Sequence, residues 1–147
     1  MKRREFIAAT AALLVSPRCS LAQGTRRRLG VLVYGERSAT MNKALLDGLR
    51  THGWIDGRNL IIEYRYAQSP VGLPASAAEL VALGPDLLLA GNPQTAVALK
   101  SATANIPIVF VSVADPVGIR LVQSLSRPGG NITGLATFVP GVTTKEI

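Results

Sequence analysis

Two short turns carry the polar residues that are best placed to bind a ligand. One turn is Gly91-Asn92-Pro93-Gln94-Thr95 and the other is Ala114-Asp115-Pro116. Each turn puts an Asn or Asp at the N-cap position of an expected helix, with proline directly after it. Helix N-termini present unpaired N–H groups and a partial positive charge. The predicted ligand-binding residues, with two from the loop after the first apolar run, are Tyr34, Ser38, Gly91, Asn92, Gln94, Thr95, Ala114 and Asp115.

The two turns differ in charge, and the difference suggests a ligand. Asn92 is neutral, so its helix end, with Gln94 and Thr95, can accept a carboxylate. Asp115 would repel a carboxylate and attract an ammonium group. We therefore expect a zwitterionic, amino-acid-like ligand. Ordinary helix capping explains either turn equally well, and Asp115 would cap its helix without any ligand.

Signals for enzyme chemistry are weak. The one histidine, His52, lies near the end of an expected helix, where it is exposed or caps the helix. The one cysteine, Cys19, belongs to no Cys/His cluster that could hold zinc. The loop at 34–38 lacks the glycine spacing of a dinucleotide site, and no Walker A loop occurs. The sequence predicts a protein that is not an enzyme and that holds no metal or cofactor.

Alternating apolar runs and amphipathic stripes predict the elements that position these turns. Strands are expected at 28–34, 59–66, 86–91, 106–113 and 132–138, and helices at about 41–50, 73–81, 93–103 and 117–125. The second strand is mixed in polarity, which is typical of a sheet edge. Strands that alternate with helices favour a doubly wound α/β fold with a parallel five-stranded sheet, in the order 2-1-3-4-5. Such sheets bind ligands at their carboxyl edge, where both turns would lie.

The N-terminus predicts an export signal peptide over residues 1–22. Basic residues at 2–4 precede an apolar run at 6–15 and small residues at 20–22. The run is too short for a permanent transmembrane helix. Arg3-Arg4-Glu5-Phe6-Ile7 resembles the twin-arginine signature, although a general secretory (Sec) signal also begins with basic residues. We expect export by one of these machineries and a soluble periplasmic chain after cleavage.

The formal charge of +7 falls once the expected signal is removed. Residues 1–22 contain four basic residues and one acidic residue, so the remaining chain carries +4. Three arginines at 26–28 stand together as a solvated lead-in to the first strand. No aromatic residues interleave with them and no second basic stripe follows, so we expect no nucleic-acid partner.

Several segments resemble one known family. They are residues 2–7 (KRREFI), 57–65 (GRNLIIEYR), 106–110 (IPIVF), 115–117 (DPV) and 127–134 (RPGGNITG). The segments are similar to the ABC-transporter substrate-binding family that includes tryptophan/tyrosine-binding lipoproteins. The resemblance covers essentially the whole chain, and its most specific piece is PGGNITG.

The resemblance implies a type I periplasmic binding fold, in which two α/β lobes joined by a hinge enclose the ligand. This chain is similar to the first lobe only. Residues 23–138 would form the N-terminal lobe, and 139–147 the hinge crossover and the start of a truncated second lobe. The family's loops equivalent to 91–95 and 113–115 face the cleft. Asn92 stands where relatives tend to carry a small or hydroxyl residue, so ligand identity does not transfer.

These observations predict the extracytoplasmic solute-binding component of an ABC importer. Its partners would be a small polar metabolite and an ABC permease in the membrane, and it would work by hinge closure. One alternative is a ligand-sensing or regulatory domain of the same fold, against which the export signal argues. Others are a small α/β enzyme that depends on His52, or a truncated fragment without independent function.

Overall fold

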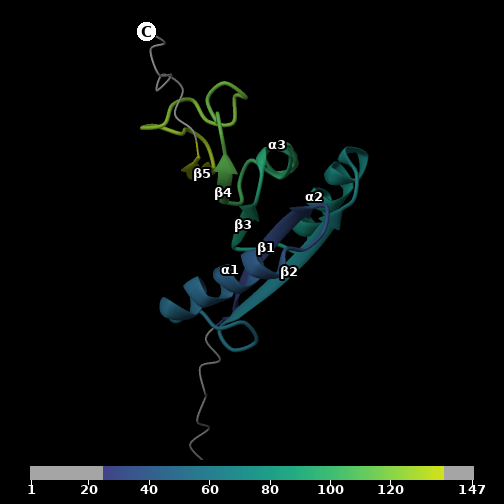
Figure 1. The fold of residues 1–147 in the computed structure, drawn as a ribbon, viewed down its shortest axis with the longest axis vertical. Helices are drawn as coiled ribbons and strands as arrows, with labels where there is room; N and C mark the ends of the chain where they lie inside the picture. Colours follow the sequence, from purple (N-terminus) through teal and green to yellow (C-terminus); the bar gives the residue numbers. More distant parts are fainter. Residues whose placement is uncertain (1–24, 138–147) are drawn as a thin grey trace, which may run out of the picture.

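The computed structural model describes residues 25–137, which form one parallel five-stranded sheet with helices on both faces (Figure 1). The strand order is β2-β1-β3-β4-β5, so the predicted fold class and order are confirmed. The predicted signal peptide (1–22) and hinge crossover (139–147) lie outside the described residues. The elements are β1 (Arg27–Tyr34), α1 (Ala39–Thr51), β2 (Leu60–Ala67), the 3-10 turn η1 (Pro70–Gly72), α2 (Leu73–Ala82), β3 (Leu87–Ala90), α3 (Pro93–Ala102), β4 (Ile108–Val113) and β5 (Ile132–Ala136).

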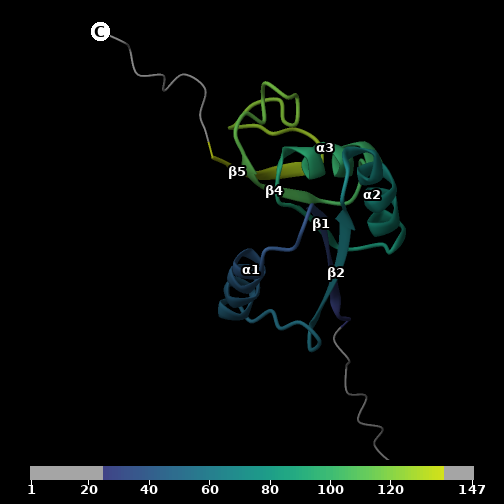
Figure 2. The same cartoon turned by 45° about the vertical axis from the view of Figure 1, so that its right-hand side comes forward.

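The first face of the sheet, called the α2/α3 face, holds the main core. Helices α2 and α3 cover it together, on the opposite side of the sheet from α1 (Figure 2). Alternate residues of the strands point into this layer, because successive strand side chains face opposite sides. Its fully or almost fully buried members include Leu32, Ala77, Leu80, Leu88, Ala90, Leu99, Ile108 and Phe110.

The second face, called the α1 face, is covered more thinly. Leu29, Val31 and Leu60 are buried there, and the half-buried Leu45 and Leu49 of α1 pack against them. No residue of α1 is buried. Of the helices that the structure describes, only α1 lies on this face, so the two sides of the sheet are packed unequally.

Glycine at position 30 is required by close packing in the middle of β1. A Cβ atom there would come within 2.8 Å of Leu88 Cδ2 and 3.3 Å of Leu80 Cδ2. The absence of a side chain lets β3 and α2 approach β1 closely. That approach helps to bury the α2/α3 face.

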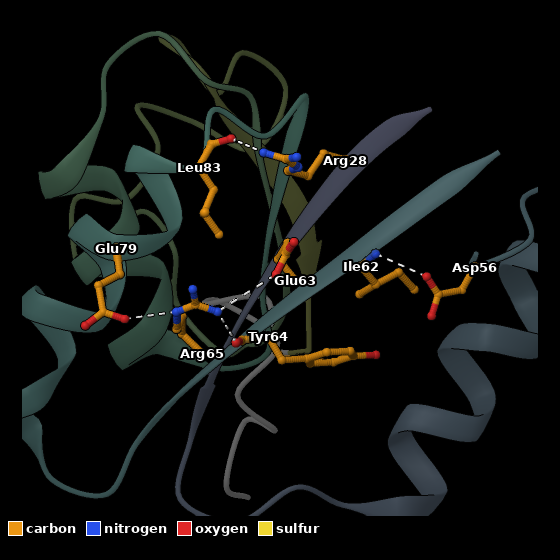
Figure 3. Close-up of polar contacts among 8 residues, drawn as sticks. All are labelled: Arg28, Asp56, Ile62, Glu63, Tyr64, Arg65, Glu79 and Leu83. Atoms are coloured by element: carbon orange, nitrogen blue, oxygen red, sulfur yellow. Dashed lines mark hydrogen bonds and ion pairs between the residues drawn. The ribbon is translucent and has the colours of Figure 1, made fainter. Parts of the chain in front are cut away.

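The β2 strand lies at the sheet edge, as its mixed polarity predicted. Its polar side chains tie it to neighbouring segments (Figure 3). Arg65 donates from Nε to Glu79 Oε2 of α2 at 2.9 Å and from Nη1 to the carbonyl of Tyr64 at 2.8 Å. The backbone N–H of Ile62 donates to Asp56 Oδ1 at 3.2 Å. The polar residues of β2 therefore attach this edge strand to α2 and to the turn that precedes it.

The arginines at the start of β1 are more engaged than the sequence suggested. Arg27 Nη1 lies 3.0 Å from Asp86 Oδ1, and the Arg28 N–H donates to Asp86 Oδ2 at 2.8 Å. Arg28 also donates from Nη1 to the carbonyl of Leu83 (Figure 3). The Arg28 N–H and the Arg27 guanidinium hold the pKa of Asp86 below its ordinary value. The lead-in is solvated at Arg27, whose side chain is 61% exposed, but Arg27 and Arg28 also fasten β1 to Asp86, directly before β3.

The helix predicted over 117–125 does not form. Successive turns replace it, in which the N–H groups of Leu121 and Val122 both donate to the carbonyl of Pro116, at 2.8 and 3.1 Å. Arg120 has a left-handed backbone with φ of 55°, which a continuous right-handed helix cannot contain. The apolar pattern that suggested a helix arises because the turns place Leu121 and Val122 in the main core.

No helix among residues 25–137 combines the length and the apolar character needed to span a bilayer.

Candidate functional site

A cavity of about 400 Å³ lies between α1 and the carboxyl edge of the sheet. We call it the edge pocket. Its floor is apolar and includes Val31, Val33, Leu45, Leu89 and Val111. Its rim is formed by the ends of β1, β3 and β4 and by the loop before α1. The rim residues are Tyr34, Glu36, Arg37, Ser38, Gly91, Asn92 and Ser112.

The pocket brings together four of the eight predicted ligand-binding residues. Tyr34, Ser38, Gly91 and Asn92 line it. They come from the ends of β1 and β3, which are neighbours in the sheet, so their meeting follows from the strand order. The other four predicted residues, Gln94, Thr95, Ala114 and Asp115, do not line this cavity.

The polar groups of the turn at Asn92, called the Asn92 corner, hydrogen-bond to one another. Asn92 Oδ1 accepts from the Thr95 N–H at 2.9 Å, and Thr95 Oγ1 accepts from the Asn92 N–H at 3.2 Å. This reciprocal pair is a capping box, and Pro93 occupies the first turn of α3. Thr95 is 0% exposed, so its hydroxyl serves the turn. Gln94 is exposed on the same turn, and the Asn92 amide nitrogen makes none of the capping bonds.

The Asp115 corner has a different structure from the Asn92 corner. Asp115 Oδ1 accepts from the Gly118 N–H at 2.8 Å, which closes a turn and caps no helix. The prediction of a helix N-cap at this position is therefore wrong. Ala114 is exposed and Asp115 is half-buried, two residues beyond the end of β4.

Ser38 supplies the N-cap of α1. Its hydroxyl accepts from the Met41 N–H at 3.3 Å. The same residue lies on the pocket rim, so its side chain is positioned by the helix that it starts.

Ser112 is a rim residue that sequence reasoning missed. Its backbone is left-handed, with φ of 56°, and the pairing of β4 with β5 shifts register between Phe110 and Val113. A register shift of this kind changes the direction of a side chain. Residues with a strained backbone are often found at functional sites. A lone polar residue inside the apolar run at 106–113 was the only signal that the sequence offered.

A second missed group stands on the α1 side of the pocket. The Arg37 guanidinium lies 4.5 Å from the centre of the Tyr64 ring, and the Tyr64 hydroxyl donates to Asn42 Oδ1 at 2.5 Å. Tyr64 also stacks on Tyr66, with ring centres 6.2 Å apart. Burial raises the pKa of Tyr64, so its hydroxyl stays protonated as a donor. Tyr34 and Ser38 of this loop were predicted to bind ligand, but the contact between Arg37 and Tyr64 was not foreseen.

His52 and the acidic residues suggest no second site. His52 is exposed at the C-cap of α1, with Nδ1 2.9 Å from the carbonyl of Gly48. Over the part of the chain that the structure describes, no three His, Cys, Asp or Glu side chains come together in a way that could hold a metal ion.

A comparison with known sequences matches the chain to a protein family. The sequence model described as ABC transporter substrate binding protein matches residues 29–144. A tyrosine-binding protein of Clostridioides difficile is 35% identical over 106 residues, which is 71% of this chain and 31% of that protein.

Comparison with solved structures gives the same fold. A conserved domain protein from Vibrio cholerae is 41% identical, with a TM-score of 0.72, over 78% of this chain and 40% of that one. A domain from Streptococcus pneumoniae, solved in complex with L-Trp, is 30% identical, with a TM-score of 0.69, over 76% of this chain and 38% of that one. The matched part of the chain thus covers less than half the length of each of these relatives.

Proposed function

Because the chain belongs to the family of ABC transporter substrate-binding proteins, we propose that it captures a small solute at the edge pocket for an importer. The observation that carries the proposal is the geometry of the pocket. Polar rim residues from two neighbouring strands meet at the carboxyl edge of a parallel sheet, above an apolar floor. This is the place where open α/β sheets bind small ligands.

We propose that the solute is amino-acid-like. Two relatives support this class, since one is named a tyrosine-binding protein and another was solved with L-Trp. The pocket also suits it, because a charged rim can hold a polar head group while the floor contacts an apolar side chain.

The proposed mechanism is capture without chemistry. The rim would form one side of a cleft, and a second domain, as in a protein of the relatives' length, would close over the solute. The closed form would dock on a membrane permease outside the cytoplasm. One side of a cleft provides part of the contacts and encloses little of the ligand, so we expect this chain alone to bind weakly.

A titration of the ¹⁵N-labelled chain followed by NMR tests the proposal, because chemical shifts detect millimolar binding. L-Tyrosine and L-tryptophan should move the amide signals of Gly91, Asn92 and Ser112. D-Glucose serves as the neutral control and should move none of them. Shifts at these residues with glucose, and none with the amino acids, would exclude an amino-acid-like solute.

A further inference from the structure

The edge pocket contains one cationic side chain, Arg37, among its lining residues. Its acidic neighbour Glu36 also lies on the rim. Five ion pairs join residues within 25–137, and Arg37 takes part in none of them. Its charge is therefore not neutralised by a side chain of the described region, and it stands beside the cavity in which the proposed solute binds.

Aromatic stacking holds the Arg37 side chain in a defined place. The guanidinium lies over the face of Tyr64 at 4.5 Å, and this ring is fixed by its hydrogen bond to Asn42 and by its stack on Tyr66. A guanidinium has five N–H donors, so one that lies over a ring face can still direct donors at an anion. Less side-chain entropy is then lost when a carboxylate binds.

The Asn92 corner is a poorer place for a carboxylate than its sequence suggested. Its capping box uses the Thr95 hydroxyl and the Thr95 N–H, and the Ala96 N–H donates to the carbonyl of Asn92 at 3.1 Å. Pro93 has no N–H to offer. The first turn of α3 therefore retains few donors for an anion.

We propose that Arg37 binds the carboxylate of the solute, and that Tyr64 positions Arg37 for this role. The inference rests on the proposed function and adds the orientation of the ligand. The carboxylate lies on the α1 side of the pocket, and the apolar part of the solute lies over the floor between β1 and β3. The site therefore selects amino acids over the corresponding amines.

The test compares L-tyrosine with tyramine, which lacks the carboxylate, using NMR titrations of the full chain and its variants. Arg37→Gln should weaken L-tyrosine binding by about tenfold or more, as expected for losing a charge-assisted hydrogen bond, and should leave tyramine binding unchanged. Arg37→Lys keeps the charge but loses the bidentate geometry. Its L-tyrosine affinity should lie between those of the unmodified chain and Arg37→Gln. Arg58→Gln removes the same charge from an exposed turn outside the pocket and is the matched control.

Two variants of Tyr64 separate positioning from direct contact. Tyr64→Phe keeps the ring but loses the hydrogen bond to Asn42, so it should weaken L-tyrosine binding less than Tyr64→Leu, which removes the ring face as well and should weaken binding severalfold. If Arg37→Gln and the unmodified chain bind L-tyrosine equally well, the proposed role of Arg37 is overturned and the proposed function is not. Absence of any amino-acid binding by the unmodified chain would instead overturn the proposed function, and this inference with it.

Discussion

The two faces of the sheet differ in how tightly they are packed. On the α2/α3 face, side chains such as Leu80, Leu88 and Leu99 are completely buried. On the α1 face, the helix buries none of its residues, and Met41 at its start is 59% exposed. The α1 face also forms the floor of the edge pocket. The tightly packed core and the edge pocket thus lie on opposite sides of one sheet.

The largest difference between the faces should appear when a leucine is truncated. Leu88→Ala removes a fully buried side chain from the α2/α3 face and should lower the free energy of unfolding by about 2–5 kcal/mol. Leu45→Ala on the half-buried α1 face should lower it by about 1 kcal/mol. Urea denaturation followed by circular dichroism measures both. Equal losses would mean that the faces contribute alike.

Two glycines sharpen the comparison with changes of opposite sign. Gly30→Ala forces a methyl group to within 2.8 Å of Leu88 Cδ2 and should destabilise the protein by about 1–3 kcal/mol. Gly48→Ala adds the same methyl group to α1, where no atom lies within 4 Å. It should stabilise the protein by about 0.5–1 kcal/mol, because alanine favours helix. Thermal melts of both variants check the signs, and a destabilised Gly48→Ala would contradict an open α1 face.

Removing the N-caps of α3 and α1 should give a smaller difference in the free energy of unfolding. Asn92→Ala breaks a complete capping box on α3 and should lower the free energy of unfolding by about 1 kcal/mol. Ser38→Ala removes one longer hydrogen bond at 3.3 Å from the loosely packed α1, and its effect should be smaller. Hydrogen exchange of the first-turn amides in each helix locates the change. Faster exchange throughout the sheet in Ser38→Ala would show that α1 matters more than its burial suggests.

Acid should loosen the attachment of β1 to β3 by a small amount. The folded pKa of Asp86 lies below the ordinary 3.8, because the Arg28 N–H and the Arg27 guanidinium favour the carboxylate. Its stabilising contribution is therefore fully present above the unfolded pKa and is lost as the pH falls through the folded pKa. An NMR titration of the Asp86 carboxyl carbon should show a midpoint below 3.8, and Arg27→Gln should raise it. A midpoint at or above 3.8 in the unmodified chain would exclude the proposed contact in solution.

Much of the fold was predictable because hydrophobic periodicity reports burial directly. The five strands, the first three helices and the strand order follow from apolar runs such as 28–34 and 86–91. The segment after β4 was not predictable in this way. There, buried Leu121 and Val122 gave a helical pattern, while Arg120 adopts a backbone that a helix cannot contain.

The residues of the candidate site were predictable only where the position of the backbone in the sheet brings them together. Asn92 and Ser38 follow strand ends, and strand order alone brings them to one edge of the sheet. Ser112 enters through a register shift between β4 and β5, and Arg37 through stacking on a tyrosine far along the chain. Such contacts depend on side-chain placement in three dimensions, which spacing in a sequence does not encode.

The capping box at the start of α3 has a consequence for which substitutions the turn can tolerate. Its hydrogen bonds link Asn92 and Thr95 to each other, so the turn is held by groups of its own residues. Gln94 is exposed on the same turn and lies outside the box. Substitutions at Gln94 should therefore leave the fold of the turn intact, whereas substitutions at Asn92 or Thr95 should not.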